Sequence, residues 1–239
     1  MKFLRLAAVL VAAAIMVHSW TLNRTLSYAG ENTAAQASVA SRSTSPSAAP
    51  PEGMALPEYN EQGALLRPVG YERWIMVGTS IGLSYSDGKA LDPNNPGQFH
   101  NVYMQPQAFD HYVRTGEFPE QTVFVVTNNP STSTQGKDSL NRAGFFAAPS
   151  KGLEVAVRDT KRFPDGWAYF MYHDKDHPAT ETTQPAAPEI RQTETAYARA
   201  ACYDCHAEHG AVDNVFTQFY SVLTHAREEH VAKSATAGP

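Results

Sequence analysis

Short runs of mostly apolar residues follow one another along the middle of the chain, each about as long as a β-strand, and residues 100–104 alternate with the two-residue period of a strand. Most of the apolar residues there are Val, Phe, Tyr or Trp, which favour strands, and Gly or Pro separates several of the segments. The segments with this pattern are 74–79, 100–104, 122–127, 145–148, 153–157 and 167–172. Residues 128–141 are polar, and we expect a loop there. The pattern predicts five or six mainly antiparallel strands.

Three other segments have a helical pattern. Residues 107–115 carry apolar side chains at helical spacing, and Gly116 follows as a typical helix end. We expect a second helix over 193–201 and a final helix that Asp213 caps and that reaches about Val231. The predicted fold class is therefore α+β, a mainly antiparallel β-sheet domain followed by C-terminal helices.

The two ends of the chain differ in composition from the middle. Residues 1–29 have a short basic start, an apolar run and small residues before Gly30, which predicts a secretory signal peptide and a periplasmic location. The apolar run is short for a membrane span, and an uncleaved anchor is the alternative. Residues 30–56 are rich in Ala, Ser and Pro and predict a disordered linker. We expect the folded domain over 57–232 and a disordered tail over 233–239.

Composition limits the possible partners. The chain has 239 residues, of which 42% are hydrophobic and 18% charged, as is ordinary for one soluble domain. The formal net charge of −5 gives no indication of nucleic acid or an anionic membrane as a partner. A negative charge is compatible with a basic electron-transfer protein.

The chain has two cysteines, which stand in the segment Cys202-Tyr203-Asp204-Cys205-His206. C-x-x-C-H is the attachment signature of c-type haem: two thiols add to the porphyrin vinyl groups, and the adjacent imidazole ligates the iron. A disulfide, a thioredoxin-like redox pair or half of a zinc site are the alternatives. A redox pair belongs near the start of a βαβ unit, and a zinc site needs about four ligands. The motif and the export signal together predict one haem c bound through Cys202 and Cys205, with His206 as the iron ligand.

The position of the motif separates classes of cytochrome. All six methionines precede it, at positions 1, 16, 54, 76, 104 and 171, whereas globular mono-haem cytochromes c supply a methionine after it. Residues 74–172 lack the period of the four-helix bundle in cytochromes c′.

The chain resembles cytochrome P-460 and its relative cytochrome c′-beta. The resemblance is carried by residues 71–79, 102–103, 116–119, 152–157, 162–164, 166–169 and 215–220, together with the haem motif. It implies a homodimer with one c-type haem in each subunit, ligated by His206 and open or water-bound on the other iron face. It also implies one of two functions: binding of a small nitrogen oxide such as nitric oxide, with or without electron transfer, or oxidation of hydroxylamine by an enzyme.

One position distinguishes these two functions. Cytochromes P-460 that oxidise hydroxylamine carry a lysine joined covalently to the porphyrin, and Val126 stands at that position here. The nearest lysine downstream is Lys137, in the predicted loop. The lack of a cross-linking lysine favours the c′-beta type, with an apolar ligand pocket that includes Val126. His100 is a second candidate for this pocket, or else a hydrogen-bonded surface histidine, and Glu194 is either a pocket base or a solvated helix charge.

Overall fold

The computed structural model describes residues 48–83, 91–133, 144–174 and 191–236. The predicted signal peptide, most of the predicted linker and Lys137 lie outside these residues. None of the helices within these ranges is long and apolar enough to cross a membrane.

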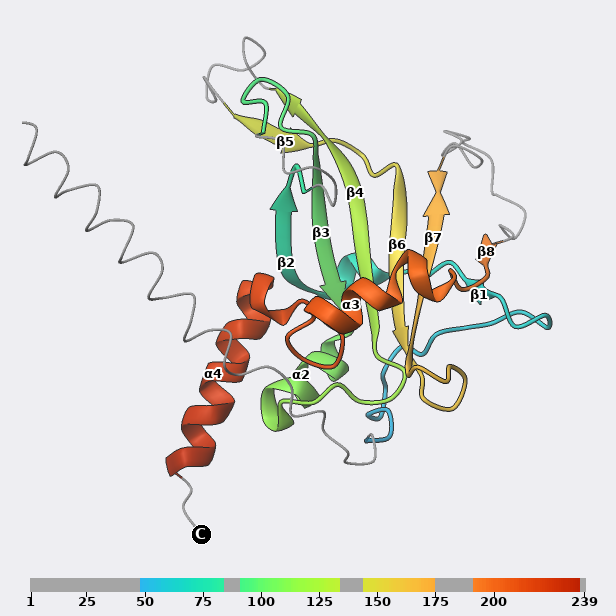
Figure 1. The fold of residues 1–239 in the computed structure, drawn as a ribbon, viewed down its shortest axis with the longest axis vertical. Coiled ribbons are helices and arrows are strands. Elements are labelled where there is room, and N and C mark those ends of the chain that lie inside the picture. Colours follow the sequence, from blue (N-terminus) through green and yellow to red (C-terminus); the bar gives the residue numbers. More distant parts are fainter. Residues whose placement is uncertain (1–47, 84–90, 134–143, 175–190, 237–239) are drawn as a thin grey trace, which may run out of the picture. The chain divides into compact units, whose positions relative to one another are not determined.

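An antiparallel sheet forms the centre of the domain (Figure 1). Its strands lie in the order β2-β3-β4-β6-β7, and β5 pairs with the far end of β4. Their bounds are β2 (Ile75–Ile81), β3 (Gln98–Met104), β4 (Val123–Ser133), β5 (Phe145–Ala147), β6 (Gly152–Arg158) and β7 (Trp167–His173). A separate two-stranded sheet pairs β1 (Leu65–Leu66) with β8 (Thr193–Glu194). The predicted α+β class is confirmed, and so are the six predicted strands.

The helices confirm one prediction and correct two. Helix α2 (Pro106–Thr115) lies where it was predicted, and Gly116 ends it with φ 75°. The helix predicted over 193–201 is wrong, because this segment pairs with β1 and then makes only a 3-10 turn, η4 (Arg199–Ala201). The final helix α4 (Ser221–Thr236) begins later than predicted.

The other helical elements are short: α3 (Tyr203–His209) and the 3-10 turns η2 (Tyr71–Arg73) and η5 (Thr217–Phe219).

Strand β4 is longer than predicted, so the expected loop is wrong over 128–133, and most of its remainder lies outside the described residues. Its polar side chains have partners within the sheet: Asn128 donates to Glu154, and Asn129 donates to the carbonyl of Ala148. The strand continues because these hydrogen bonds replace the contact with water that polar residues otherwise make.

The folded part of the chain also begins earlier and ends later than expected. Residues 48–56, which the sequence placed in the linker, contact the domain: Met54 is buried in the core, and the Glu120 amide donates to the carbonyl of Ala48. At the other end, α4 reaches Thr236, beyond the predicted boundary at 232.

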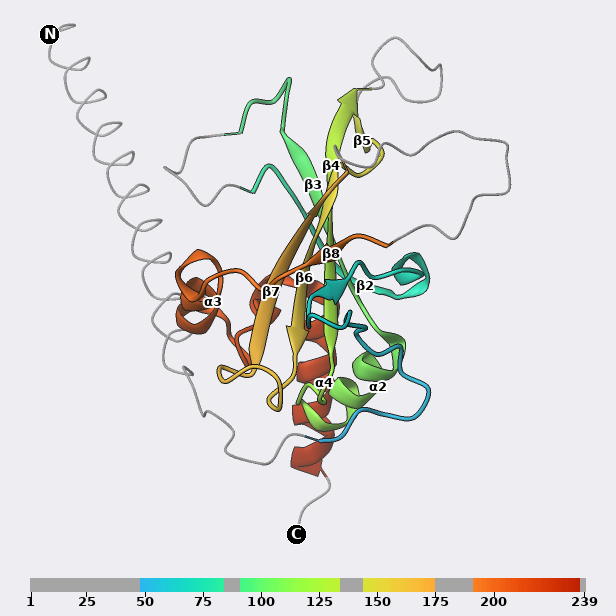
Figure 2. The same ribbon diagram turned by 90° about the vertical axis from the view of Figure 1, so that its right-hand side faces the viewer.

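The two faces of the sheet are covered by different elements (Figure 2). On one face, α2, α3, α4 and the loop after α3 contact side chains such as Val102, Phe124 and Tyr169. On the other face, Leu65 and the aromatic side chains of Tyr59 and Phe163 cover a cluster from β4, β6 and β7. This second cluster consists of Val123, Val125, Leu153, Val155, Val157, Ala168, Phe170 and Tyr172.

Candidate functional site

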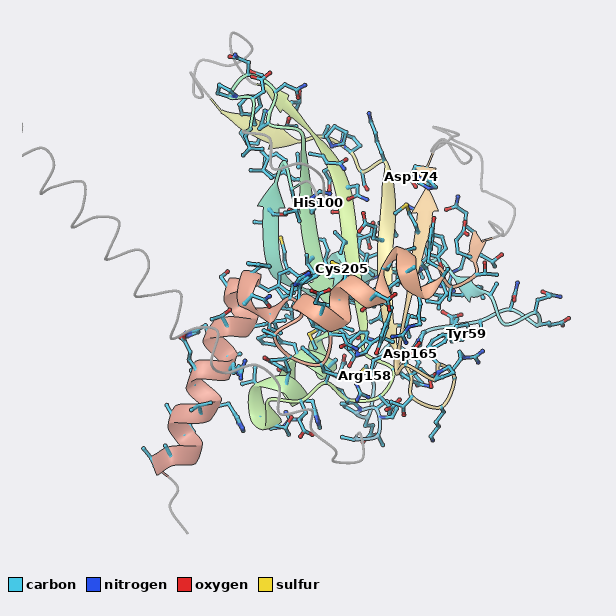
Figure 3. The ribbon with its side chains drawn as sticks, viewed as in Figure 1. Tyr59, His100, Arg158, Asp165, Asp174 and Cys205 are labelled. Carbon is cyan, nitrogen blue, oxygen red and sulfur yellow. The ribbon has the colours of Figure 1, made fainter. Side chains whose placement is uncertain are left out.

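A cavity lies between the sheet and the segment that carries the C-x-x-C-H motif, and Cys202 and His206 both line it. Helix α3 crosses in front of β4, β6 and β7, so the motif faces the strands that form the opposite wall (Figures 1 and 3). We call the sheet face that lines this cavity the cavity face. Much of its lining is apolar or aromatic and includes Phe124, Val126, Ala156 and Val215.

The His206 ring is held on three sides. It lies between the rings of Tyr169 and Phe216, with a centroid distance of 4.4 Å to each. Its Nδ1 atom lies 2.9 Å from the carbonyl oxygen of Asn214, so Nδ1 carries the proton and donates it to this acceptor. Burial lowers the pKa of the imidazole, which favours the neutral form. The remaining nitrogen, Nε2, therefore has the free lone pair that a metal ligand needs.

The acceptor for His206 comes from a tight turn. Val212 and Val215 pair across it, and the two residues between them, Asp213 and Asn214, have φ 44° and 63°. Positive φ at both central positions is the pattern of a type I′ turn, which favours Asn and Asp. Asp213 therefore forms this turn instead of capping the final helix.

Gly210 makes room for this turn beside α3. A Cβ atom at Gly210 would lie 2.5 Å from the carbonyl carbon of Asn214 and 2.7 Å from the carbonyl oxygen of His206. No side chain fits there without moving the turn away from His206, so the short spacing between His206 and Asn214 depends on a glycine.

The two cysteines are free thiols: Cys202 immediately precedes α3 and Cys205 lies within it. Cys202 lines the cavity and Cys205 is exposed, as Figure 3 shows for Cys205 on α3. Burial raises the pKa of the Cys202 thiol, whereas thioredoxin-like cysteines have a lowered pKa. The described residues contain no group of three or more His, Cys, Asp or Glu that could hold a metal ion.

Strand pairing brings Val126 into the cavity together with two residues that sequence reasoning missed. Val126 on β4 pairs with Glu154 on β6, and Glu154 pairs with Met171 on β7. All three line the cavity. Asn128 donates to the Glu154 carboxylate at 3.1 Å. The predicted apolar wall is therefore only partly apolar, because it also contains the carboxylate of Glu154.

Two of the residues that line the cavity have a buried polar atom without a hydrogen-bond partner among the described residues. These atoms are the Tyr169 hydroxyl oxygen and the indole Nε1 of Trp167. A buried polar group without a partner costs about 1–3 kcal/mol, so such groups are rare unless a ligand or water satisfies them. Burial raises the pKa of Tyr169, and the hydroxyl remains a hydrogen-bond donor. Both groups are hydrogen-bond donors on residues that line the cavity.

Two further candidates from the sequence do not line the cavity. His100 pairs with Asn128 on the same sheet face, farther along β3, where Figure 3 labels it above Cys205. Its Nε2 lies 3.4 Å from the Gln98 amide nitrogen. Glu194 lies in β8 beside β1, and its charge contributes to raising the pKa of Tyr172 on the opposite sheet face. Neither position could be predicted from its own segment, because the register between paired strands decides which residues lie beside the cavity.

The donor set fits a c-type haem. Cys202, a neutral histidine with one free ring nitrogen, an apolar wall and two residues with unpartnered donors line one cavity, and Cys205 stands at C-x-x-C spacing from Cys202. The sequence model of the family described as Cytochrome P460 matches residues 68–217, which include all of these groups.

The chain belongs to the cytochrome P460 family. This membership identifies it as a haem cytochrome and confirms the resemblance seen in the sequence. No curated protein matches the chain. Val126, which the resemblance predicts at the position of the cross-linking lysine, lines the cavity of this cytochrome P460 family member.

Proposed function

We propose that this cytochrome holds one haem c through Cys202 and Cys205, with His206 as the only protein ligand to iron, and binds a small nitrogen oxide such as nitric oxide. When bound, haem would supply an iron that changes oxidation state and takes up diatomic ligands. The observation that carries the proposal is His206, whose Nδ1 is hydrogen-bonded to Asn214 and which faces a wall containing Val126 instead of a lysine.

The side chains around the cavity support ligand capture. Val126, Phe124 and Ala156 exclude water and offer neither a covalent link nor a ligand to iron. Asn214 fixes the tautomer of His206 and strengthens it as a ligand. Within the described part of the chain, no lysine lines the cavity.

The test is the absorption spectrum of the ferrous protein before and after addition of carbon monoxide or nitric oxide. We expect a high-spin spectrum that both gases change at once, and no anomalous red-shifted band of a cross-linked haem. A low-spin ferrous spectrum that ignores both gases contradicts the proposal. Met171 would then be the first candidate for a sixth ligand, because its thioether lines the same cavity. Met171→Leu should convert such a protein to the high-spin form.

Oxidation of hydroxylamine is the second candidate, and Glu154 is the observation that favours it. A carboxylate that borders the cavity and accepts a hydrogen bond from Asn128 can also accept a proton from a substrate. If the protein is such an enzyme, Glu154→Gln should lower hydroxylamine turnover about 100-fold or more. Glu194→Gln is the matched control, since Glu194 lies outside the cavity.

We further propose that the protein is exported to the periplasm, forms a homodimer and can exchange electrons with a partner protein. The signal-like residues 1–29 and the family resemblance support these proposals. Cell fractionation and light scattering of the purified holoprotein test the location and the dimer. A cytoplasmic monomer would contradict both.

A further inference from the structure

Two ion pairs connect the sheet to the turn whose Asn214 carbonyl accepts the hydrogen bond from His206. Arg158, the last residue of β6, lies 2.6 Å through its Nε from the Asp213 carboxylate. Its Nη1 lies 2.6 Å from the carboxylate of Glu120. Asp213 immediately precedes Asn214, whose carbonyl accepts the hydrogen bond from His206 Nδ1. Figure 3 labels Arg158 below Cys205.

The ion pair between Arg158 and Glu120, at the sheet, is well buried. Glu120 is buried, with 7% of its surface exposed, and it accepts hydrogen bonds from both the amide and the hydroxyl of Thr160. The Arg158 side chain is 12% exposed. Ion pairs in such partly buried places are screened less by salt than surface pairs are. The guanidinium group is also planar, so one arginine fixes the relative positions of both carboxylates.

The 212–215 turn depends on the ion pair between Asp213 and Arg158. Two successive non-glycine residues with positive φ are energetically unfavourable, and the 212–215 turn carries both. Asn214 is the residue whose carbonyl must stay within hydrogen-bond distance of His206. A carboxylate one residue away, anchored to the sheet, prevents the turn from moving outward.

We infer that Arg158 is a positioning residue for the axial histidine: through Asp213 it fixes the Asn214 carbonyl and thereby sets the strength of His206 as a ligand to haem iron. The inference rests on the proposed function, in which His206 ligates the iron. A strong hydrogen bond at Nδ1 makes the imidazole a better electron donor, which stabilises ferric iron and lowers the reduction potential. Loss of the anchor should therefore raise the potential.

The direct electrostatic effect of these two charges on the reduction potential differs from the effect of losing their contact, so the two can be separated by experiment. Removal of a positive charge near haem lowers the potential, whereas removal of a negative charge raises it. Arg158→Gln and Asp213→Asn remove opposite charges but break the same contact. If the contact positions His206, both variants raise the potential. Asp213→Asn suits this test because asparagine also favours a left-handed turn.

The experiment is redox titration of the full-length holoprotein, combined with resonance Raman measurement of the iron–histidine stretching frequency. We expect both variants, and Arg158→Lys, to raise the ferrous-to-ferric ratio at a fixed potential about threefold to tenfold. This corresponds to about 30–60 mV, at 59 mV per tenfold change. The iron–histidine frequency should fall in all three variants. Arg158→Lys keeps the charge and loses the planar fork, so its shift reports geometry alone.

Arg199→Gln is the matched control. Arg199 lies beside the motif and pairs with Asp165 and Asp204 and not with Asp213. It should leave the iron–histidine frequency unchanged. One contradicting result is that Arg158→Gln and Asp213→Asn load haem but shift the reduction potential in opposite directions, and another is that they keep the wild-type potential and iron–histidine frequency. Either result overturns the positioning role of Arg158 and leaves the proposed function standing. Wild-type protein without haem overturns the proposed function and this inference with it.

Discussion

The same three strands, β4, β6 and β7, build two faces of the sheet that differ in how their polar groups are satisfied. Tyr172 and Tyr169 illustrate the difference, since both are buried in β7 and lie on opposite faces. The Tyr172 hydroxyl donates to the carbonyl of Leu65 at 2.9 Å. The Tyr169 hydroxyl has no partner among the described residues.

We call the face that carries Tyr172 the closed face. Its cluster of valines, leucines and aromatic residues packs against Leu65 and is nearly free of exposed surface. The cavity face carries Trp167, Tyr169, Glu154 and Met171 around an open space. A buried polar group without a partner lowers stability unless a ligand or water satisfies it, and the Tyr169 hydroxyl and the Trp167 indole nitrogen are two such groups on residues that line the cavity. The closed face supplies the stability on which that arrangement depends.

The largest effect on stability should come from the closed face. Leu153→Ala removes a fully buried side chain and should lower the free energy of unfolding by about 2–5 kcal/mol, because the cavity that it leaves cannot fill completely. The absorption spectrum of the haem should stay that of the wild type. Urea unfolding and absorption measurements test this. A changed haem spectrum with an unchanged free energy of unfolding would contradict the assignment of stability to the closed face and of ligand binding to the cavity face.

The two tyrosines should respond differently to loss of their hydroxyl groups. Tyr172→Phe leaves the buried Leu65 carbonyl without its partner and should destabilise the protein by about 1–3 kcal/mol. Tyr169→Phe removes a hydroxyl without a protein partner, so in a variant that lacks both cysteines it should not destabilise. In the holoprotein it should change the resonance Raman spectrum of the haem. Equal destabilisation by both substitutions in the cysteine-free variant would contradict the comparison.

The smallest effect should come from Val126→Thr, which keeps the side-chain shape and adds a hydroxyl to the cavity wall. One new hydrogen bond is worth about 0.5–1.5 kcal/mol, so carbon monoxide dissociation should slow about twofold to tenfold. Flash photolysis and ligand exchange measure this rate. Val125→Thr is the control, because Val125 is buried in the closed face. It should leave the dissociation rate unchanged even though it destabilises the fold.

Much of the fold could be predicted because all six strand segments are short runs rich in β-branched or aromatic residues, several of them bounded by Gly or Pro. The errors have a common cause. Thr193 and Glu194 form a strand only because β1 lies beside them, and β4 continues through Asn128 and Asn129 because neighbouring strands satisfy their polar groups. Pairing between distant segments decides these cases, and no local pattern reports it.

In the candidate site, too, some residues could be found from local sequence and others only from strand pairing. Cys202, Cys205 and His206 carry a local signature, and Val126 followed from the family resemblance. Glu154 and Met171 could not be found, because only the register of β4, β6 and β7 places them beside Val126.

The link from Arg158 to Asp213 spans 55 positions in the sequence. The one signal that could have indicated part of this arrangement is the Asp213-Asn214 pair, which is typical of a tight turn and was assigned to a helix cap.

The most direct test of the account is the intact mass of the full chain, expressed in bacteria that export it and that load a reference c-type cytochrome with haem. Covalent attachment predicts a mass equal to the processed polypeptide plus one haem, and loss of that haem in the variant that combines Cys202→Ala and Cys205→Ala. An unmodified polypeptide mass in cells where the reference cytochrome is fully loaded would contradict covalent attachment at this motif.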